Sequence, residues 1–292
     1  MTIGLYGIEF YYNYLSYYQQ IIDRFHREKI PVYIYSELYK HLSSHLQFET
    51  KPKIFSNHAE VKENVSILFS IGGDGCFLSS VTFVRDSSIP ILGINLGNLG
   101  FLSSIAKTEI DNAISSVIAN NYILDKRTLI QLHTQENHFA DMNFALNEFT
   151  VVKKDNLSMI NIHVYVNDVF LNTYWADGLI VSTPTGSTGY SLSCSGPIVA
   201  PGSKVFLLTP IATHNLTVRP VVIPDNSIIK LRVSGRNKQF LGGLDSRFET
   251  IGAETELILS KAEFKVNLIQ VSTASFFNTI REKLNWGIDK RN

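Results

Sequence analysis

The stretch VSILFSIGGDG, residues 65–75, decides how the first half of this chain folds. Its first seven residues, 65–71, are nearly all apolar, which is typical of a strand buried on both faces of a parallel sheet. The glycines that follow end this strand, and residues 76–84 then show the apolar spacing of a helix. The stretch therefore predicts a strand, a glycine-rich turn and a helix in succession.

The same alternation of strand and helix recurs through residues 1–125. Further elements of this part are predicted as strands at 2–7, 30–35 and 89–94 and as helices at 15–29 and 109–120. A succession of this kind predicts an N-terminal α/β domain, Rossmann-like, in which helices cover a parallel sheet. This domain carries the GGDG sequence.

After residue 126 the apolar spacing changes to the alternation of half-buried strands, as in 160–166 and 229–233. Other strands are predicted at 129–134, 145–152, 179–182, 205–209, 257–259 and 264–271, and helical patterns only at 190–193 and 276–286. We therefore predict a mainly antiparallel all-β C-terminal domain over residues 126–270. Residues 271–292 are predicted as a tail helix that could pack back on the N-terminal domain.

The composition is that of a globular protein, with 292 residues of which 45% are hydrophobic and 18% charged. Lys plus Arg and Asp plus Glu number 26 each, so the basic excess typical of a nucleic-acid binder is missing. No apolar run approaches the ~18–20 residues of a membrane span, and the N-terminus lacks the pattern of a signal peptide. We therefore expect a cytoplasmic protein with neither nucleic acid nor membrane as a partner. Two cysteines, Cys76 and Cys194, are too few for a disulfide scaffold or a metal knuckle.

Eleven of the 18 glycines lie in two windows, 72–100 and 178–202. Glycine carries an entropic penalty, so clustering indicates either tight turns or a close approach of the main chain to a ligand. In the first window the N–H groups of Gly72, Gly73 and Gly75 can form a nest for phosphate beside a helix N-terminus. Neither GxGxxG nor GxxxxGK[ST] occurs, which disfavours hydride transfer and P-loop chemistry.

Asp74 lies inside this glycine turn. One interpretation is that its carboxylate caps the following helix, as aspartate does well. The other is that a carboxylate among phosphates coordinates Mg²⁺ or takes the proton from a hydroxyl nucleophile. Glycine on both sides of Asp74 favours the second interpretation, because capping alone does not need it.

The second window contains a loop rich in hydroxyl groups, with six Ser and Thr residues between Ser182 and Ser191. Such a loop can bind a polyhydroxylated or phosphorylated ligand, and a solvated turn is the alternative. Asn147 and Glu148 place an amide and a carboxylate in an otherwise apolar strand, where buried polar groups need partners. These partners are either structural or a ligand. Adjacent strand residues point to opposite faces unless a bulge turns both to one side.

Four motifs stand in order along the chain: GGDG at 72–75, GINLGNLGFL at 93–102, Asn147-Glu148, and DGLIVSTPTGSTGYSLSCSGP at 177–197. With LTVRP at 216–220 they resemble the NAD kinase family over nearly the whole chain. The resemblance implies transfer of the γ-phosphate of ATP to the 2′-hydroxyl of the adenosine ribose of NAD, which gives NADP. It also implies Mg²⁺ or another divalent cation carried mainly by ATP, no metal site of protein side chains, and a homodimer or homotetramer.

The resemblance also implies roles for individual residues. Asp74 matches the catalytic proton acceptor, and Gly72, Gly73 and Gly75 match the phosphate loop for ATP. Asn147 and Glu148 match the pair that holds the adenosine side of NAD, and Asp177 matches a contact to the nicotinamide end across a subunit boundary. The remaining residues of the implied NAD site are Gly75, Thr188, Gly189, Tyr190, Ser191, Leu192 and Ser193.

The chain departs from the family pattern at a few positions. Cys76 replaces the usual threonine, which is expected to remove a hydroxyl donor near the phosphates. Trp175 stands where many members have arginine, so a charge near the ligand is lost, and Arg247 stands in place of a common glutamine. We include Trp175 and Arg247 among the expected ligand contacts. Two alternatives are a diacylglycerol-type lipid kinase, which a neutral chain without a basic amphipathic helix does not favour, and a catalytically silent NADP(H)-binding protein.

Overall fold

The computed structural model describes the whole chain except residues 9–11, 98–99, 155–157, 272–275, 285 and 287–292. It consists of two compact units, one formed by Met1–Lys126 with Val266–Asn292 and the other by Arg127–Lys265. The strand β18 (Leu257–Gln270) runs from the second unit into the first. The second unit therefore ends at Lys265, earlier than the expected residue 270, because the end of β18 pairs with the first unit's sheet.

The first unit is built on a parallel sheet with the strand order β18-β5-β4-β1-β2-β3 and with β6 beside β5. All of these neighbours are parallel. Its own strands are β1 (Ile3–Tyr6), β2 (Val32–Tyr35), β3 (Lys53–Phe55), β4 (Ile67–Ile71), β5 (Ile91–Asn95) and β6 (Ile105–Ala106). The predicted parallel sheet is confirmed.

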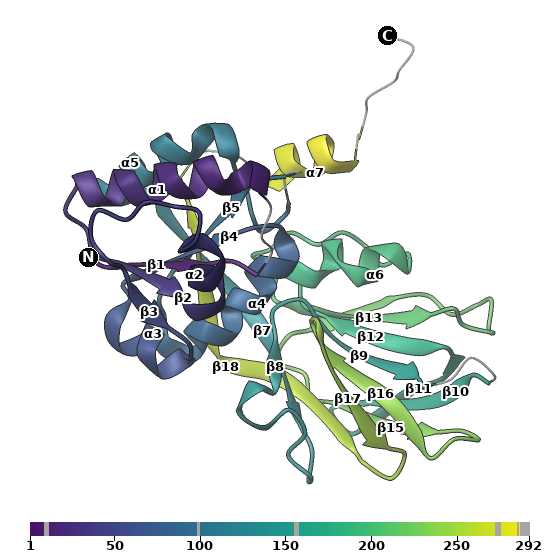
Figure 1. Ribbon diagram of the computed structural model, residues 1–292. Helices are drawn as coiled ribbons and strands as arrows, with labels where there is room; N and C mark the ends of the chain where they lie inside the picture. Colours follow the sequence, from purple (N-terminus) through teal and green to yellow (C-terminus); the bar gives the residue numbers. More distant parts are fainter. Residues whose placement is uncertain (9–11, 98–99, 155–157, 272–275, 285, 287–292) are drawn as a thin grey trace. The chain divides into compact units, whose positions relative to one another are not determined.

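Helices cover both faces of this sheet, with α1 and α5 on one side and α3 and α4 on the other (Figure 1). The helices of this unit are α1 (Leu15–Arg27), α2 (Ser36–Leu42), α3 (His58–Asn64), α4 (Asp74–Val84), α5 (Ile110–Ile118) and α7 (Phe276–Leu284), with the 3₁₀ turns η1 (Tyr12–Tyr14), η2 (Arg85–Ser87) and η3 (Lys107–Glu109). Periodicity missed α2, β3 and α3. Each has seven residues or fewer, which is too short for an apolar period to become visible.

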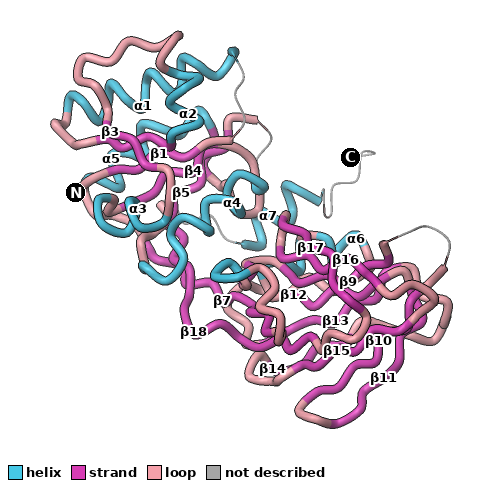
Figure 2. The backbone as a smooth tube through the Cα atoms, turned by 60° about the horizontal axis from the view of Figure 1, so that its bottom comes forward, coloured by secondary structure: helices cyan, strands magenta, loops and turns pink. Residues whose placement is uncertain are grey.

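The second unit contains two antiparallel sheets, and in Figure 2 it is drawn mostly as strand. One sheet has the order β14-β13-β12-β9-β16-β17, and the other contains β11-β10-β15-β18 with β7 and β8. Its strands are β7 (Ile123–His133), β8 (Phe144–Ala145), β9 (Glu148–Lys153), β10 (Ile160–Val166), β11 (Val169–Ala176), β12 (Gly178–Ser182), β13 (Val205–Ile211), β14 (Val221–Pro224), β15 (Ile229–Ser234), β16 (Gln239–Leu244) and β17 (Arg247–Gly252). Within the described residues, its short helical segments are η4 (Ala140–Met142), η5 (Thr185–Thr188) and α6 (Tyr190–Ser193).

A single hydrophobic core fills the space between the two sheets of the second unit. Phe149 and Leu179 enter it from one sheet, and Ile162 and Leu231 enter it from the other. This is the arrangement expected when strands alternate apolar and polar residues and bury one face each. The predicted mainly antiparallel β domain is confirmed.

Three predicted strands of this unit are divided or joined in the structure. The strand predicted at 145–152 is interrupted, because β8 ends at Ala145 and β9 begins at Glu148. The two strands predicted at 257–259 and 264–271 form the one strand β18. Periodicity also missed β11, β14, β16 and β17.

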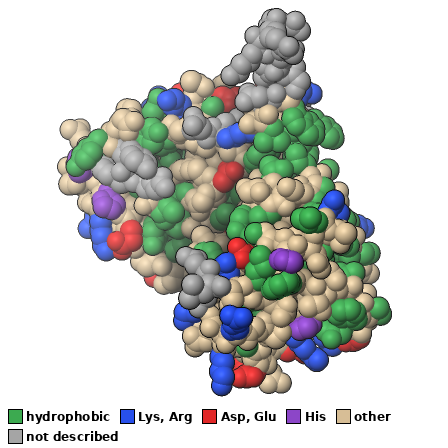
Figure 3. Space-filling view, turned by 90° about the vertical axis from the view of Figure 1, so that its right-hand side faces the viewer, with side chains coloured by type: hydrophobic (Ala, Val, Ile, Leu, Met, Phe, Trp, Pro, Cys, Tyr) green, Lys and Arg blue, Asp and Glu red, His purple; other side chains and the backbone are tan. Residues whose placement is uncertain are grey.

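The surface carries charges of both signs. On the face drawn in Figure 3, acidic and basic side chains are interspersed among polar and hydrophobic ones. Within the described part of the chain, no helix is long and apolar enough to cross a membrane.

The aromatic pair Phe25 and Phe69 tests the core of the first unit. The two buried rings meet edge to face, with centroids 5.3 Å apart and an interplanar angle of 89°. We expect Phe69→Leu to lower the free energy of unfolding by about 1–2 kcal/mol, because it removes this contact and leaves a small void. Urea unfolding measures the change. Phe277→Leu, at an exposed position, should leave the urea unfolding curve unchanged. Equal shifts of the curve for both variants would contradict the stabilising role of the Phe25–Phe69 contact.

Candidate functional site

The glycine turn lies where the sequence places it, between β4 and α4. Gly72 has a φ of +153°, and a Cβ at this position would lie 2.7 Å from the Cβ of Cys76. Its N–H donates to the carbonyl of Ile94 at 2.9 Å, which ties the turn to the neighbouring strand β5. The turn thus requires glycine at its first position and is held by main-chain contacts.

The Asp74 carboxylate gathers three successive main-chain N–H groups. Its Oδ1 accepts hydrogen bonds from Leu102 and Ser103, each at 3.0 Å, and its Oδ2 accepts one from Phe101 at 2.8 Å. A Cβ on Gly100 would lie 1.8 Å from Oδ1, so only glycine fits there. The structure therefore brings the GGDG and GINLGNLGFL motifs together, although 98 and 99 lie outside the described residues.

The two interpretations of Asp74 can be separated on this geometry. The N-cap residue of α4 is Gly73, and the Asp74 side chain points to residues 101–103 instead of capping its own helix. An ionised carboxylate has about four lone-pair positions, and three hydrogen bonds leave room for one more donor. Asp74 can therefore hold the 101–103 segment and still receive a ligand hydroxyl.

The Cys76 side chain faces the interior of the first unit. Its Sγ donates to the carbonyl of Ile71 at 3.5 Å and accepts from the hydroxyl of Ser70 at 3.6 Å. The residue is only 4% exposed. The expectation that cysteine removes a hydroxyl donor near the phosphates is therefore not met, because this side chain lies behind the turn against β4.

In the second unit the break between β8 and β9 lets Asn147 and Glu148 reach the same place. A Cβ on Gly189 would lie 3.2 Å from both Asn147 Nδ2 and Glu148 Oε2. The interruption between β8 and β9 thus brings the two side chains to one side, which we expected from the sequence only with a bulge. The hydroxyl-rich loop packs on the same break. The N–H of Thr183 donates to the carbonyl of Asn147 at 2.9 Å, and a Cβ on Gly186 would lie 2.2 Å from the same carbonyl oxygen.

Four buried oxygen atoms around this pair have no hydrogen-bond partner among the described residues. They are Asn147 Oδ1, Glu148 Oε2, Thr150 Oγ1 and Ser182 Oγ. Glu148 lies opposite Ser182 in the pairing of β9 with β12, and Thr150 follows two residues later on the same face. Buried polar groups in native proteins are nearly always paired, so these oxygens indicate a place for a polar ligand or ordered water.

Burial raises the pKa of Glu148 to about 8, and the nearby carboxyl of Asp245 contributes in the same direction. At neutral pH this side chain is therefore mostly protonated and can donate a hydrogen bond as well as accept one. Burial also raises the pKa of Tyr190, with smaller effects from Cys194, Asp177 and Glu148.

Among the other residues of the expected NAD site, several side chains form contacts within the fold. Asp177 forms an ion pair with Lys153 at 2.6 Å. Thr188 donates to the carbonyl of Thr185 at 3.2 Å, and the buried Ser191 hydroxyl shares a hydrogen bond of 2.8 Å with Thr209. These residues can contact a ligand through the main chain, whereas Leu192 is half-buried and Ser193 is exposed.

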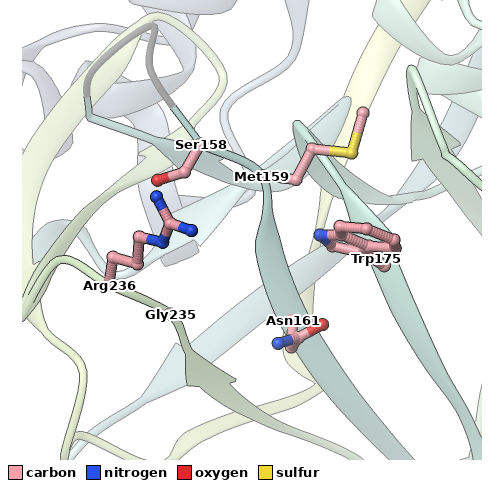
Figure 4. A pocket seen from close by; sticks show the side chains of 6 residues that line it. All are labelled: Ser158, Met159, Asn161, Trp175, Gly235 and Arg236. Carbon is pink, nitrogen blue, oxygen red and sulfur yellow. The ribbon is translucent and has the colours of Figure 1, made fainter.

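Trp175 lines a hollow, whereas the Arg247 side chain contacts the main chain. The Trp175 ring lies 4.2 Å from the His214 ring and lines an open hollow of about 650 Å³ (Figure 4). Arg236 lines the same hollow, so a cation is present although position 175 is not arginine. The Arg247 guanidinium donates to the carbonyls of Met142 and Phe144, which gives it a role in holding the main chain.

Sequence reasoning missed Thr150 and Arg236 as members of these surroundings, and it included Ser182 only as part of the hydroxyl-rich loop. Asp245, two residues before Arg247, was not expected to take part in the site either. A usable signal existed for Thr150, since it follows Glu148 at the two-residue period of a strand.

A glycine turn that can hold phosphate, together with an amide and a carboxyl group whose buried oxygens have no partner among the described residues, is typical of a nucleotide-binding protein. Residues 14–122 match the ATP-NAD kinase N-terminal domain, and residues 146–271 match the ATP-NAD kinase C-terminal domain. The NAD kinase of Cytophaga hutchinsonii is 42% identical over the full length of both chains, and that of Flavobacterium psychrophilum is 50% identical over 82% of each. The chain therefore belongs to the NAD kinase family.

Solved structures show the same fold. A crystal structure of yeast NADH kinase complexed with NADH aligns with a TM-score of 0.88 at 22% identity, covering 99% of this chain and 89% of the other. An NAD kinase from Archaeoglobus fulgidus in complex with ATP aligns with a TM-score of 0.75 at 20% identity, covering 98% and 99%.

Replacing Gly100 tests the contact between Asp74 and the 101–103 segment. We expect Gly100→Ala to displace this segment, because its Cβ would collide with Asp74 Oδ1. Amide hydrogen exchange at residues 101–103 should become faster by about tenfold or more. Gly202→Ala is the matched control, since a Cβ there meets nothing within 4 Å, and unchanged protection in both variants would contradict the contact.

The raised pKa of Glu148 predicts a pH dependence of stability. The folded state holds the proton more tightly than the unfolded chain, so this stabilisation is complete below about pH 4.5 and is lost as the pH rises through about 8. Glu148→Gln removes the titration. Its melting temperature should fall less than that of the wild type between about pH 5 and pH 8. If the melting temperatures of the two ligand-free proteins fall in parallel over this pH range, the raised pKa of Glu148 is refuted.

Proposed function

We propose that this NAD kinase transfers the γ-phosphate of ATP to the 2′-hydroxyl of the adenosine ribose of NAD, giving NADP and ADP. Phosphoryl transfer needs little covalent chemistry from the protein, so positioning and charge carry most of the work. The observation that carries the proposal is the Asp74 carboxylate, which is anchored at a glycine turn and keeps room for one more donor.

In this proposal Asp74 accepts the proton of the 2′-hydroxyl as that oxygen attacks the γ-phosphorus. The three main-chain N–H groups hold the carboxylate in place, so its remaining lone pair has a defined direction. The N–H groups of Gly73 and Gly75 would bind the phosphates at the start of α4, where the helix dipole favours negative charge. The expected contribution of the Gly72 N–H is not part of this proposal, because that group donates to the carbonyl of Ile94.

Asn147 and Glu148 would bind the adenosine side of NAD. Their unpartnered oxygens supply acceptors, and the Asn147 amide and the protonated Glu148 supply donors. A ligand rich in hydroxyl and amino groups would satisfy all of them, which supports a nucleoside here. The loop from Thr188 to Ser193 would close on the ligand mainly with its main chain, beside Gly189.

Mg²⁺ or another divalent cation would arrive with ATP and neutralise phosphate charge. Among the described residues, no three His, Cys, Asp or Glu side chains form a group that could hold a metal ion. The described residues therefore offer no cage of protein side chains, so the ion would be held mainly by the nucleotide.

We further propose that the chain forms a homodimer or homotetramer, in which Asp177 contacts the nicotinamide end of NAD bound to a neighbouring copy. We also propose a cytoplasmic location, where both substrates occur.

The two alternatives lose support. Membership of the NAD kinase family disfavours a lipid kinase. A silent NADP(H)-binding protein would require the departure at Cys76 or Trp175 to abolish turnover, but the Cys76 thiol points to the interior and Arg236 lines the same hollow as Trp175.

The purified chain should form NADP from NAD, ATP and Mg²⁺. Asp74→Asn should lower kcat by about 10²–10⁴-fold, because an amide cannot take the proton. An enzyme-coupled NADP assay measures the rate, and a melting curve checks the fold. Asp86→Asn, an exposed aspartate of the first unit, should retain full activity.

Three outcomes would contradict the proposal. Tight NADP binding without turnover in the wild type would identify a binding protein, and phosphorylation of diacylglycerol would identify a lipid kinase. Full activity in Asp74→Asn would remove this residue from catalysis.

A further inference from the structure

Asp245 makes four hydrogen bonds with one short segment of main chain. Its Oδ2 accepts from the N–H of Leu146 at 2.9 Å, and its Oδ1 accepts from Asn147 at 2.8 Å and Glu148 at 3.3 Å. Its own N–H donates to the carbonyl of Glu148 at 3.1 Å. One residue thus holds the whole break between β8 and β9.

The fold explains why an aspartate is needed at this place. Where β8 stops and β9 starts, the N–H groups of Leu146 and Asn147 point to no neighbouring strand and would otherwise be unpaired. Strand β16 pairs with β9, so the turn after Leu244 brings Asp245 directly to the break. Asp245 takes a φ of +53°, a left-handed conformation that aspartate tolerates better than most residues.

The same hairpin also holds the other side of the break. Arg247, the first residue of β17, donates to the carbonyls of Met142 and Phe144 just before and within β8. Asp245 and Arg247 therefore bind donors on one side of the break and acceptors on the other. This explains why the Arg247 guanidinium is committed to the main chain.

The side chains beyond these hydrogen bonds converge. Asn147 Nδ2 and Glu148 Oε2 both approach Gly189, and an oxygen of each remains unpartnered among the described residues. Adjacent residues of a regular strand would point to opposite faces. Their convergence depends on the main-chain path that Asp245 holds.

We propose that Asp245 is a positioning residue, whose carboxylate fixes the main chain of residues 146–148 so that Asn147 and Glu148 meet one ligand together. It acts through these two residues and not by touching the ligand. The proposal rests on the proposed function insofar as that ligand is NAD.

Asp245→Asn tests the proposal. An amide keeps one acceptor oxygen and places an NH₂ group against at least one main-chain N–H, so the segment loses part of its support. We expect the KM for NAD to rise about tenfold or more, with kcat at saturating NAD and the KM for ATP within about twofold of the wild type. Amide hydrogen exchange at residues 146–148 should become faster.

Asp225→Asn is the matched control. Asp225 is a buried aspartate of the second unit, and its carboxylate pairs with Lys261 at 3.0 Å, away from the break. This variant should lower the melting temperature without changing the KM for NAD. If Asp245→Asn does not fold, Asp245→Gly replaces it, because glycine suits the left-handed turn and removes only the carboxylate. The same rise in KM for NAD is expected.

The outcomes separate the two proposals. An unchanged KM for NAD, or equal losses toward NAD and ATP, would overturn the positioning role. Unchanged hydrogen exchange at residues 146–148 would also overturn it, and this readout needs no turnover. A wild type that makes no NADP would refute the proposed function. Hydrogen exchange at residues 146–148 would still test whether Asp245 holds this segment.

Discussion

In both units of this protein an aspartate carboxylate gathers three successive main-chain N–H groups. Asp74 does so for residues 101–103, and Asp245 does so for residues 146–148. Each segment leaves the regular ladder of a sheet, where its N–H groups would be unpaired at about 1–3 kcal/mol each. The carboxylate supplies the hydrogen-bond acceptors that a neighbouring strand would otherwise provide, and it thereby fixes the main-chain path of an irregular segment. The candidate catalytic group and the candidate NAD-binding pair both depend on this device.

The class of each domain could be predicted from the sequence because burial leaves a clear period. Residues 65–71 are nearly all apolar, as expected for a strand covered on both faces, and residues 160–166 alternate because one face meets the core. The short elements between residues 36 and 64 could not be predicted in this way. The strand β16 was missed because Gly242 and Gly243 interrupt its apolar pattern with residues typical of turns.

The candidate site was predictable as a set of residues and not as a geometry. GGDG and Asn147-Glu148 stand out because glycine and buried polar groups need a reason. The partners of Asp74 lie 27 to 29 residues away along the chain, and those of Asp245 lie 97 to 99 residues away. A local sequence pattern cannot predict contacts between residues so far apart along the chain. The inward orientation of Cys76 and the break before Glu148 escape the sequence for the same reason, since tertiary packing sets both.

The course of β18 has a consequence for synthesis of the chain. One edge of β5 pairs with the last residues of this strand, at Leu268 opposite Ile91, so the entire second unit is translated between the two partners. At roughly 5–20 residues per second the ribosome needs about 10–35 s to cover that interval. During this delay an apolar strand would keep open backbone groups on a sheet edge, which is where nascent chains aggregate. A chaperone that shields β5 until the C-terminus emerges would therefore raise the yield of folded enzyme.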